Sequence, residues 1–315
     1  MAADEEPAPM TPDPSPAPGR GAVPARAPSD VLRSLVDAAE VEIVPIRGVE
    51  EHLGSLRAGT TVTITASPKF GYGRTLDYAA LVAEAGHRPV PHLAARQVRD
   101  EAELADIVAR LGDSGVRDLY VIGGDVPEPA GAFTSAGQVL AALSEMDHGV
   151  DRIGVACYPE GHPAIADEAL LEALRWKQSM ATYMVSQLCF DAATLAGWVR
   201  RIRAAGVHLP LYLGIAAPMS AAKLLPLSMR IGVGSSLRYL TKQQGLVGRL
   251  FRGGSYRPDD LLLDLGDDLG RGDLRIEGLH VCTFNRLAAT LAWQRELAGD
   301  EGSGARAQPD DEEDR

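Results

Sequence analysis

The chain has 315 residues, of which 45% are apolar and 23% charged, and its formal net charge is −12. No apolar run approaches the roughly 20 residues that a membrane-spanning helix needs, so the composition excludes an integral membrane protein. A chain this acidic, without a basic stripe, is also poorly suited to neutralising phosphates. We therefore expect neither a membrane nor a nucleic-acid partner.

The two ends differ in composition from the rest of the chain. Residues 1–30 are rich in Pro and Ala and hold five acids against two bases, and residues 299–315 hold seven against two. Such segments bury too little apolar surface to offset the entropy of ordering, so we predict disordered tails flanking one catalytic domain, residues 31–298. The start lacks the features of a secretory signal, and three scattered cysteines suit a reducing compartment, which together predict a cytoplasmic protein.

Eight apolar runs rich in β-branched residues alternate with segments whose apolar residues recur every three or four positions. This alternation of strand and helix patterns, eight times in about 260 residues, predicts an α/β fold of the (β/α)8 TIM-barrel type. An open doubly wound sheet is less consistent with the sequence, because no Gly-x-Gly-x-x-Gly motif follows the first apolar run. The stretch 218–278 predicts two or more extra helices between strands seven and eight. The predicted strands are residues 41–45, 61–65, 89–92, 118–122, 152–156, 183–187, 211–215 and 279–282.

In such a barrel the chemistry lies at the carboxyl ends of the strands, so residues at or just past each run are the candidates. Glu42 is unusual because it lies inside an apolar run. It either points outward or lies in a partly dry barrel interior, which would raise its pKa and keep a proton available, and we expect a general acid. The other candidates are Lys69, Arg74, His92, Asp125, Tyr158, His162, Gln187, Phe284 and Arg286.

Several of these residues also have purely structural interpretations. Asp125 could cap a helix, Gln187 could be a buried hydrogen-bonding amide, and Arg286 could pair with a neighbouring acid. Histidines beside Asp125 could form a metal cluster, but no His-x-His or His-Glu-x-x-His pattern supports one, so we predict no metal and treat the cysteines as packing residues. The basic stretch 238–252 is expected to cover a barrel end or to meet another subunit, which leaves a homo-oligomer possible.

Seven short motifs follow one another along residues 41–290, each at a predicted strand. Each motif is weak alone, whereas their common order is specific. They are Glu42 in a Glu-x-x-Pro context, His92-Leu93, Gly124-Asp125-Val126-Pro127, Tyr158-Pro159-Glu160-Gly161-His162-Pro163, Gln187 followed by Phe190-Asp191, the run 210–215, and Thr283-Phe284-Asn285-Arg286.

In this order the motifs resemble the signature of the methylenetetrahydrofolate reductase family. The resemblance implies reduction of 5,10-methylenetetrahydrofolate to 5-methyltetrahydrofolate by NADH or NADPH, with the folate as the small-molecule partner. Glu42 matches the family's acid, which protonates N10 to open the five-membered ring. Asp125 and Gln187 match positions that hydrogen-bond the pterin, and Asp125 would also stabilise the developing cation. Phe284 and Arg286, in the last of the seven motifs, are assigned to substrate binding by the same resemblance.

The family normally carries FAD, and the chain departs from its pattern. The loop 67–74 is bulkier and more basic than the family's turn, and Leu170 stands where a family acid contacts the flavin's sugar region. These changes resemble a flavin-independent branch, in which the nicotinamide would occupy the flavin's place and pass hydride directly.

The cofactor residues follow from the same resemblance. Lys69, Arg74 and Lys177 are then candidates for the nicotinamide's pyrophosphate, and His92 is a further cofactor candidate. Because Tyr158, His162 and Lys177 match FAD contacts in the family, FAD stays open, with its absence slightly favoured.

Two rival functions are a methyltransferase that uses methyltetrahydrofolate and a barrel that binds folate without catalysis. Glu42 favours an enzyme over a binding protein, and the ordered motifs favour hydride transfer over methyl transfer.

Overall fold

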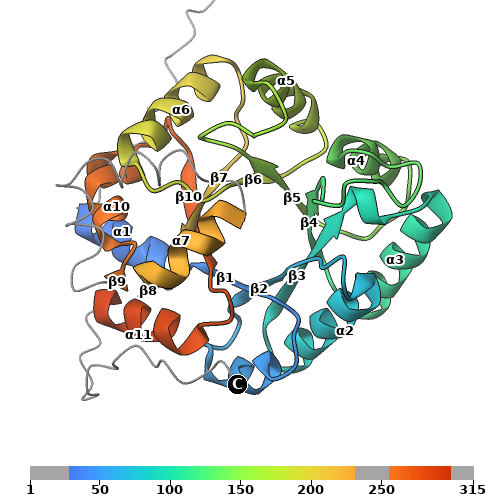
Figure 1. The fold of residues 1–315 in the computed structure, drawn as a ribbon, viewed down its shortest axis with the longest axis horizontal. Helices are drawn as coiled ribbons and strands as arrows, with labels where there is room; N and C mark the ends of the chain where they lie inside the picture. Colours follow the sequence, from blue (N-terminus) through green and yellow to red (C-terminus); the bar gives the residue numbers. More distant parts are fainter. Residues whose placement is uncertain (1–27, 231–254, 299–315) are drawn as a thin grey trace, which may run out of the picture.

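The computed structural model describes residues 28–230 and 255–298, and its centre is a closed barrel of eight parallel strands (Figure 1). The strands follow one another around the barrel in the order β1-β10-β7-β6-β5-β4-β3-β2. All eight overlap the runs predicted from sequence, which confirms the (β/α)8 prediction. Their bounds are β1 Glu40–Ile43, β2 Thr61–Ile64, β3 Arg88–Ala94, β4 Asp118–Ile122, β5 Arg152–Cys157, β6 Tyr183–Ser186, β7 Leu211–Ala216 and β10 Ile276–Cys282.

Helices surround the barrel because each buries an apolar stripe against the outward side chains of the strands. In α6, for example, Leu195, Val199 and Ile202 are buried at the spacing that the sequence predicts. Figure 1 shows the ring that these helices form around the strands. Their bounds are α1 Pro28–Asp37, η1 Val49–Ser55, α2 Gly71–Glu84, η2 Ala95–Gln97, α3 Glu101–Asp113, α4 Ala136–Ser144, α5 Asp167–Lys177, α6 Ala192–Ala204 and α11 Leu287–Ala298.

The connection between β7 and β10 carries the extra helices that its length predicts. Its elements are β8 Met219–Ser220, α7 Ala221–Arg230, β9 Ser255–Tyr256, α10 Asp259–Leu265 and η4 Gly266–Gly270. Leu224 of α7 and Tyr256 of β9 pack with Leu188 and Phe190, which follow β6. Helix α7 therefore lies over one side of the barrel mouth (Figure 1). The basic stretch 238–252 lies outside the described residues.

Helix α1 begins at Pro28, inside the segment 1–30 that the composition predicts to be a tail. It belongs to the fold because Leu35 and Val36 are buried in the core, and because Gln294 of α11 donates a hydrogen bond to the Val36 carbonyl. The rest of the predicted tails, 1–27 and 299–315, lies outside the described residues. None of the helices in the described part has the length and apolar content of a membrane span.

The barrel interior is polar and aromatic, whereas its outer layer is aliphatic. On β1 the two-residue period of a strand places Glu40 and Glu42 on the inner face, and Val41 and Ile43 on the outer, buried face. The other inward side chains that matter below are His92, Tyr120, Arg152, Tyr183, Tyr212, His280 and Cys282.

Candidate active site

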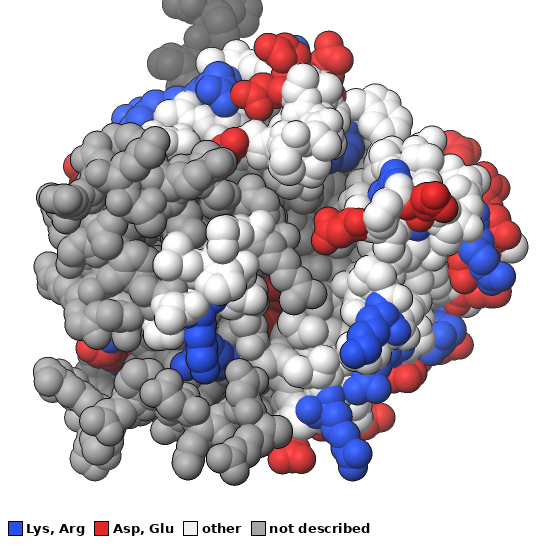
Figure 2. Space-filling view, in the orientation of Figure 1, with Lys and Arg blue, Asp and Glu red and all other residues white. Residues whose placement is uncertain are grey.

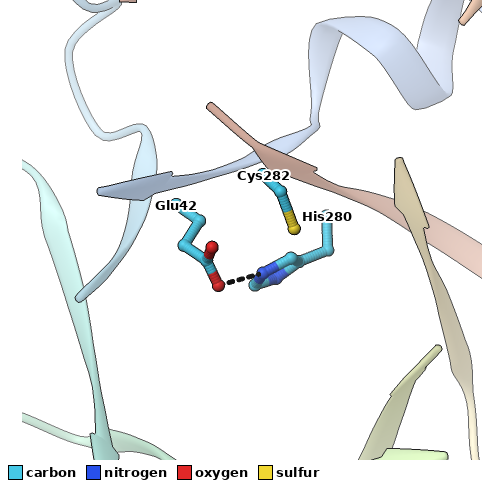
Figure 3. Close-up of side chains that lie close together, drawn as sticks. All are labelled: Glu42, His280 and Cys282. Carbon is cyan, nitrogen blue, oxygen red and sulfur yellow. Dashed lines mark hydrogen bonds and ion pairs between the residues drawn. The ribbon is translucent and has the colours of Figure 1, made fainter. Parts of the chain in front are cut away.

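Glu42 and His280 form the centre of the site. Strands β1 and β10 pair so that Glu40 lies opposite His280, and Glu42 lies opposite Cys282. His280 Nε2 is 3.2 Å from Glu42 Oε2 (Figure 3). Its Nδ1 is 3.4 Å from Glu40 Oε2. Both ring nitrogens of His280 face a carboxylate. A protonated ring carries an N–H on each nitrogen, so it can donate one hydrogen bond to each of the two carboxylates.

The charge on His280 reverses the pKa shift expected for Glu42. Burial raises the pKa of Glu42, but the hydrogen bond and the positive charge of His280 outweigh it and hold that pKa below its ordinary value. Burial likewise lowers the pKa of His280, and its hydrogen bonds with Cys282, Glu40 and Glu42 raise that pKa well above the usual range. The expectation of a raised Glu42 pKa is wrong because it did not include this histidine.

His92 of β3 completes the inner cluster. Its side chain is 5% exposed, and its ring lies edge-on against Tyr120 at 4.7 Å between centroids. Its Nε2 is 3.7 Å from Glu42 Oε2 and has no hydrogen-bond partner within the described ranges. Burial lowers the pKa of His92 to about 4, so the ring is neutral. The structure therefore places His92 beside the acid, and its assignment to the cofactor stays a prediction.

Behind Glu40 a row of paired charges continues toward the opposite end of the barrel. Arg152 Nη2 is 3.9 Å from Glu40 Oε1, and Arg152 Nη1 is 3.1 Å from Asp118 Oδ2. Asp118 in turn binds Arg88 at 2.9 Å. Buried charges cost several kcal/mol each unless they are paired, so this row is what allows Glu40 to lie inside the barrel.

Glu42 is the acid that a ligand can reach. Its side chain is 16% exposed, against 3% for Glu40. The space-filling view shows a hollow in the middle of this face, with acidic atoms at its bottom and basic side chains on its lower right, over α2 (Figure 2). A molecule entering from the mouth of the barrel would meet Glu42 first.

The Thr283-Phe284-Asn285 motif holds the end of β1 in place. The Asn285 side chain accepts from Val44 N at 2.8 Å and donates to Val44 O at 3.0 Å, while Thr283 Oγ1 donates to the Glu42 carbonyl. Phe284 and Asn285 adopt left-handed φ values of 50° and 63°. The motif thus ties the end of the last strand, β10, to the end of the first strand, β1. The half-buried Phe284 ring packs against the cluster that includes Phe190.

Arg286 does not have the acidic partner that a structural interpretation requires. It makes no ion pair with any acid in the described part of the chain, and its Nε is buried without a hydrogen-bond partner there. An unpaired buried guanidinium nitrogen near the barrel mouth leaves Arg286 available to a ligand.

Asp125 and Gln187 lie where a ligand could contact them. Asp125 is exposed after β4. Helix α4 begins eleven residues later, at Ala136, and Ser135 occupies its N-cap, so the helix-cap interpretation is wrong. Gln187 follows β6, and its Oε1 accepts a hydrogen bond from Leu188 N at 2.8 Å. Within the described residues its NH₂ group makes no hydrogen bond, so that group can serve a ligand.

Tyr158, His162 and Lys177 gather near β5. The rings of Tyr158 and His162 meet edge to face at 5.2 Å, and Lys177 with Tyr158 lines a cavity of about 280 Å³ between β5, α5 and α6. Burial lowers the pKa of Lys177, which forms no ion pair with the described acids.

Lys69 and Arg74 lie elsewhere: Lys69 is in the loop before α2, and Arg74 is in the first turn of α2. Lys69 is exposed, with its ammonium 5.4 Å from the centre of the Phe70 ring. Arg74 donates to Pro45 O at 2.8 Å, and its guanidinium lies 5.0 Å from the Phe70 ring centre. Strands β3 and β4 separate this pair from Lys177 around the barrel (Figure 1). The structure therefore places Lys177 at a different part of the barrel from Lys69 and Arg74.

Glu40, His280 and Cys282 are site residues that the sequence reasoning did not assign. Glu40 and Glu42 share a strand face by their spacing, as do His280 and Cys282. That period could have identified both pairs. It could not have shown that they face each other, because the pairs are more than 230 residues apart.

Comparison with known proteins is consistent with this architecture. Residues 57–232 match the model of a family described as methylenetetrahydrofolate reductase. Methylenetetrahydrofolate reductase 2 of Saccharomyces cerevisiae is 28% identical over 121 residues, 35% of this chain and 20% of that protein. Methylenetetrahydrofolate reductase 1 of Schizosaccharomyces pombe is 28% identical over 114 residues, 34% of this chain and 19% of that protein.

A bacterial relative is matched over a larger share of its length. The 5,10-methylenetetrahydrofolate reductase of Pectobacterium carotovorum subsp. carotovorum is 29% identical over 144 residues, 44% of this chain and 47% of that protein. The matched part of the chain thus spans about a fifth of the two yeast proteins and about half of the bacterial one.

Proposed function

The chain belongs to the methylenetetrahydrofolate reductase family, a family of oxidoreductases, and from this premise we propose that it reduces 5,10-methylenetetrahydrofolate to 5-methyltetrahydrofolate with hydride from NADH or NADPH. The observation that carries the proposal is the Glu42–His280 pair at the mouth of the barrel. It holds a proton between His280 Nε2 and the partly exposed carboxylate of Glu42, which can pass it on to open the folate ring.

The proton follows a short route. It lies between His280 Nε2 and Glu42 Oε2 and passes through the Glu42 carboxyl group to N10 of the folate. The bond between N10 and the methylene carbon then breaks, and its electron pair stays on N10. The carbon, now an iminium with N5, accepts the hydride. Glu40 keeps the ring of His280 oriented through Nδ1 but is too buried to reach the substrate.

Four residues around the mouth are proposed to bind the folate. The exposed carboxylate of Asp125 would stabilise the iminium cation, since fixed negative charge near a developing positive charge lowers the barrier. The NH₂ group of Gln187, which has no partner among the described residues, would hydrogen-bond the pterin. Arg286, whose Nε likewise has none there, would bind the substrate together with the Phe284 ring.

The residues near β5 are proposed to bind the nicotinamide cofactor, which supplies the hydride when bound. The cavity beside Tyr158 contains Lys177, whose charge lacks a carboxylate partner in the described residues and would be offset by a pyrophosphate. His162 lies against Tyr158. Lys69 and Arg74 lie across the barrel and are left out of this assignment.

We further propose that the hydride passes directly, without flavin. Two features support this: the bulky loop 67–74, where Arg74 is anchored to Pro45 and stacks on Phe70, and Leu170, which lines the Lys177 cavity with an apolar side chain. A stoichiometric flavin spectrum in the freshly purified protein would overturn direct transfer and leave the reductase proposal standing.

The decisive assay is oxidation of NADH or NADPH by the purified chain, measured as loss of nicotinamide absorbance on addition of 5,10-methylenetetrahydrofolate. We expect turnover that depends on both substrates and yields 5-methyltetrahydrofolate. Methyl loss from methyltetrahydrofolate without nicotinamide oxidation would instead identify a methyltransferase. Folate binding without any turnover would identify a binding protein.

A further inference from the structure

The cluster at the centre of the site is also a set of metal ligands. A carboxylate oxygen of Glu42, a ring nitrogen of His280 and Sγ of Cys282 lie within 4.8 Å of one another (Figure 3). One oxygen, one nitrogen and one sulfur donor are the mixture that borderline ions such as Zn²⁺ and Co²⁺ bind. The side chains come from the paired strands β1 and β10, so rigid backbone holds them.

The spacing within the cluster fits tetrahedral coordination. Metal–nitrogen and metal–oxygen bonds of about 2.0–2.1 Å place two tetrahedral ligand atoms roughly 3.3–3.4 Å apart. The separation of His280 Nε2 and Glu42 Oε2, 3.2 Å, already has this value. All separations among the three donor atoms are within 4.8 Å, and any that exceed the tetrahedral spacing must shorten for the sulfur to form a metal bond of about 2.3 Å.

Glu40 occupies the position of an outer-shell carboxylate. Metal-bound histidines usually donate their second ring N–H to a carboxylate, which fixes the tautomer and the ring orientation. The Nδ1 of His280 faces Glu40 Oε2 at 3.4 Å, which directs Nε2 toward Glu42. Glu40 is itself 2% exposed and is held near Arg152.

His92 offers a fourth ligand. It is 5% exposed, and its Nε2 points toward Glu42 Oε2 at 3.7 Å without a hydrogen-bond partner in residues 28–230 or 255–298. Buried polar atoms are nearly always satisfied, so the unpartnered ring nitrogen beside Glu42 is available to a ligand. His92 lies outside the group of three donors, its ring centre 6.3 Å from that of His280, and would have to move closer to join them. Its neutral form is the one that coordinates metals.

We propose that Glu42, His92, His280 and Cys282 bind one divalent ion of the Zn²⁺ and Co²⁺ class, and that the bound ion stops the reductase reaction. Bonds form from the metal to one oxygen, two nitrogens and one sulfur, and the protons on His280 Nε2 and Cys282 Sγ leave to solvent. No electron is transferred. The carboxylate and the thiolate balance the charge of the ion, and Glu42 no longer has a proton to deliver. The inhibition rests on the proposed function, whereas the binding does not.

The test is a Co²⁺ titration of the full chain after treatment with a chelator, followed by absorption spectroscopy. We expect one Co²⁺ per chain, tetrahedral d–d bands and a thiolate-to-cobalt charge-transfer band, all displaced by Zn²⁺. Cys282→Ser should abolish the charge-transfer band, while Cys189→Ser, at a buried cysteine outside the cluster, should keep it. Glu40→Gln should weaken Co²⁺ binding about 10–100-fold.

The outcomes separate the two halves of the proposal. A wild-type spectrum without the thiolate band, or binding unchanged in Cys282→Ser, would show adventitious metal only and overturn the site. If the spectrum is as expected and Zn²⁺ leaves the rate of the active enzyme unchanged, the inhibitory role is overturned. A chain that never oxidises NADH or NADPH would refute the proposed function, and the cobalt spectrum would still decide the metal site.

Discussion

Glu40 and Glu42 lie two residues apart on the same face of β1, yet they meet different surroundings. Glu42 is partly exposed at the mouth and shares His280 Nε2, whereas Glu40 is closed off and shares Nδ1. Two side chains of the same type therefore have different roles: Glu42 faces a ligand, and Glu40 orients the histidine. The difference comes from depth in the barrel and not from residue type.

Replacing Glu42 with Gln removes the group that hands over the proton while keeping the side-chain shape. We expect kcat to fall about 10²–10⁴-fold, the usual contribution of a general acid. The measurement is steady-state nicotinamide oxidation. Glu277→Gln, the same change at an exposed position of β10, should leave kcat near wild type. A Glu42→Gln enzyme as fast as wild type would show that another group protonates the folate.

Asn285 ties the first and last strands of the barrel together, so replacing it should lower the free energy of unfolding. Asn285→Ala leaves Val44 N and Val44 O without partners, and we expect the free energy of unfolding to fall by about 1–3 kcal/mol. Asn285→Asp keeps the acceptor for Val44 N and loses the donor to Val44 O. Its free energy of unfolding should therefore lie between those of the wild type and Asn285→Ala. Urea denaturation measures both. Equal stability of the alanine variant and the wild type would show that these two hydrogen bonds do not stabilise the fold.

At the scale of single residues, the sequence predicted the place of Glu42 in the barrel interior but not the direction of its pKa shift. A carboxylate inside an apolar run is visible in the sequence, and Glu42 does lie in the barrel interior. The sign of its pKa shift depends on His280, which is 238 residues away. Similarly, the helix-cap interpretation of Asp125 failed because α4 begins ten residues later than a cap there would require.

At the scale of elements, strand periodicity explains how the interior accommodates large rings. Gly154 of β5 lies against Tyr183 of β6, and a Cβ on Gly154 would be 2.4 Å from the tyrosine ring. Tyr183 cannot easily retreat, because its ring also lies against Arg152 and Tyr212. Glycine is therefore required here for space rather than for backbone conformation.

Gly154→Ala should overpack this layer and lower stability by about 1–3 kcal/mol. The matched control is Gly197→Ala in α6, where a Cβ would meet nothing within 4 Å and where alanine is a better helix former than glycine. That variant should gain roughly 0.5–1 kcal/mol. Thermal unfolding followed by circular dichroism would compare them. If both changes shift stability in the same direction, the steric argument for Gly154 is wrong.

Element positions were well predicted from sequence, because the strand and helix periods are local properties. Several strand ends differ from the predicted runs by one to three residues, and α1 starts inside the predicted tail. A short amphipathic helix next to a Pro-rich segment has no local feature that separates it from a tail, and burial of Leu35 and Val36 against the rest of the chain decides the matter.

At the scale of the whole molecule, barrel closure controls access to the cysteines. Cys157 and Cys189 are 1% and 2% exposed, and burial raises the pKa of both, that of Cys189 to about 12. A thiol is reactive as the thiolate, so neither should be alkylated in the native protein at neutral pH.

We expect these two cysteines to be labelled by iodoacetamide only as the protein unfolds, at the denaturant concentration where circular dichroism changes. Mass spectrometry of labelled peptides would follow each cysteine, and fully unfolded protein supplies the control for complete labelling. Rapid labelling of Cys157 without denaturant would show that β5 opens locally, which the closed barrel argues against.

The sequence by itself determined the fold class, the order of the eight strands along the chain and the family motifs, because each depends on residues close together in the chain. Only the tertiary structure decided which inward side chains meet: Glu42 with His280 and His92, and Lys177 apart from Lys69 and Arg74. These contacts depend on strand register and on the order of strands around a closed barrel. Both are fixed by packing between distant segments, which no local pattern records.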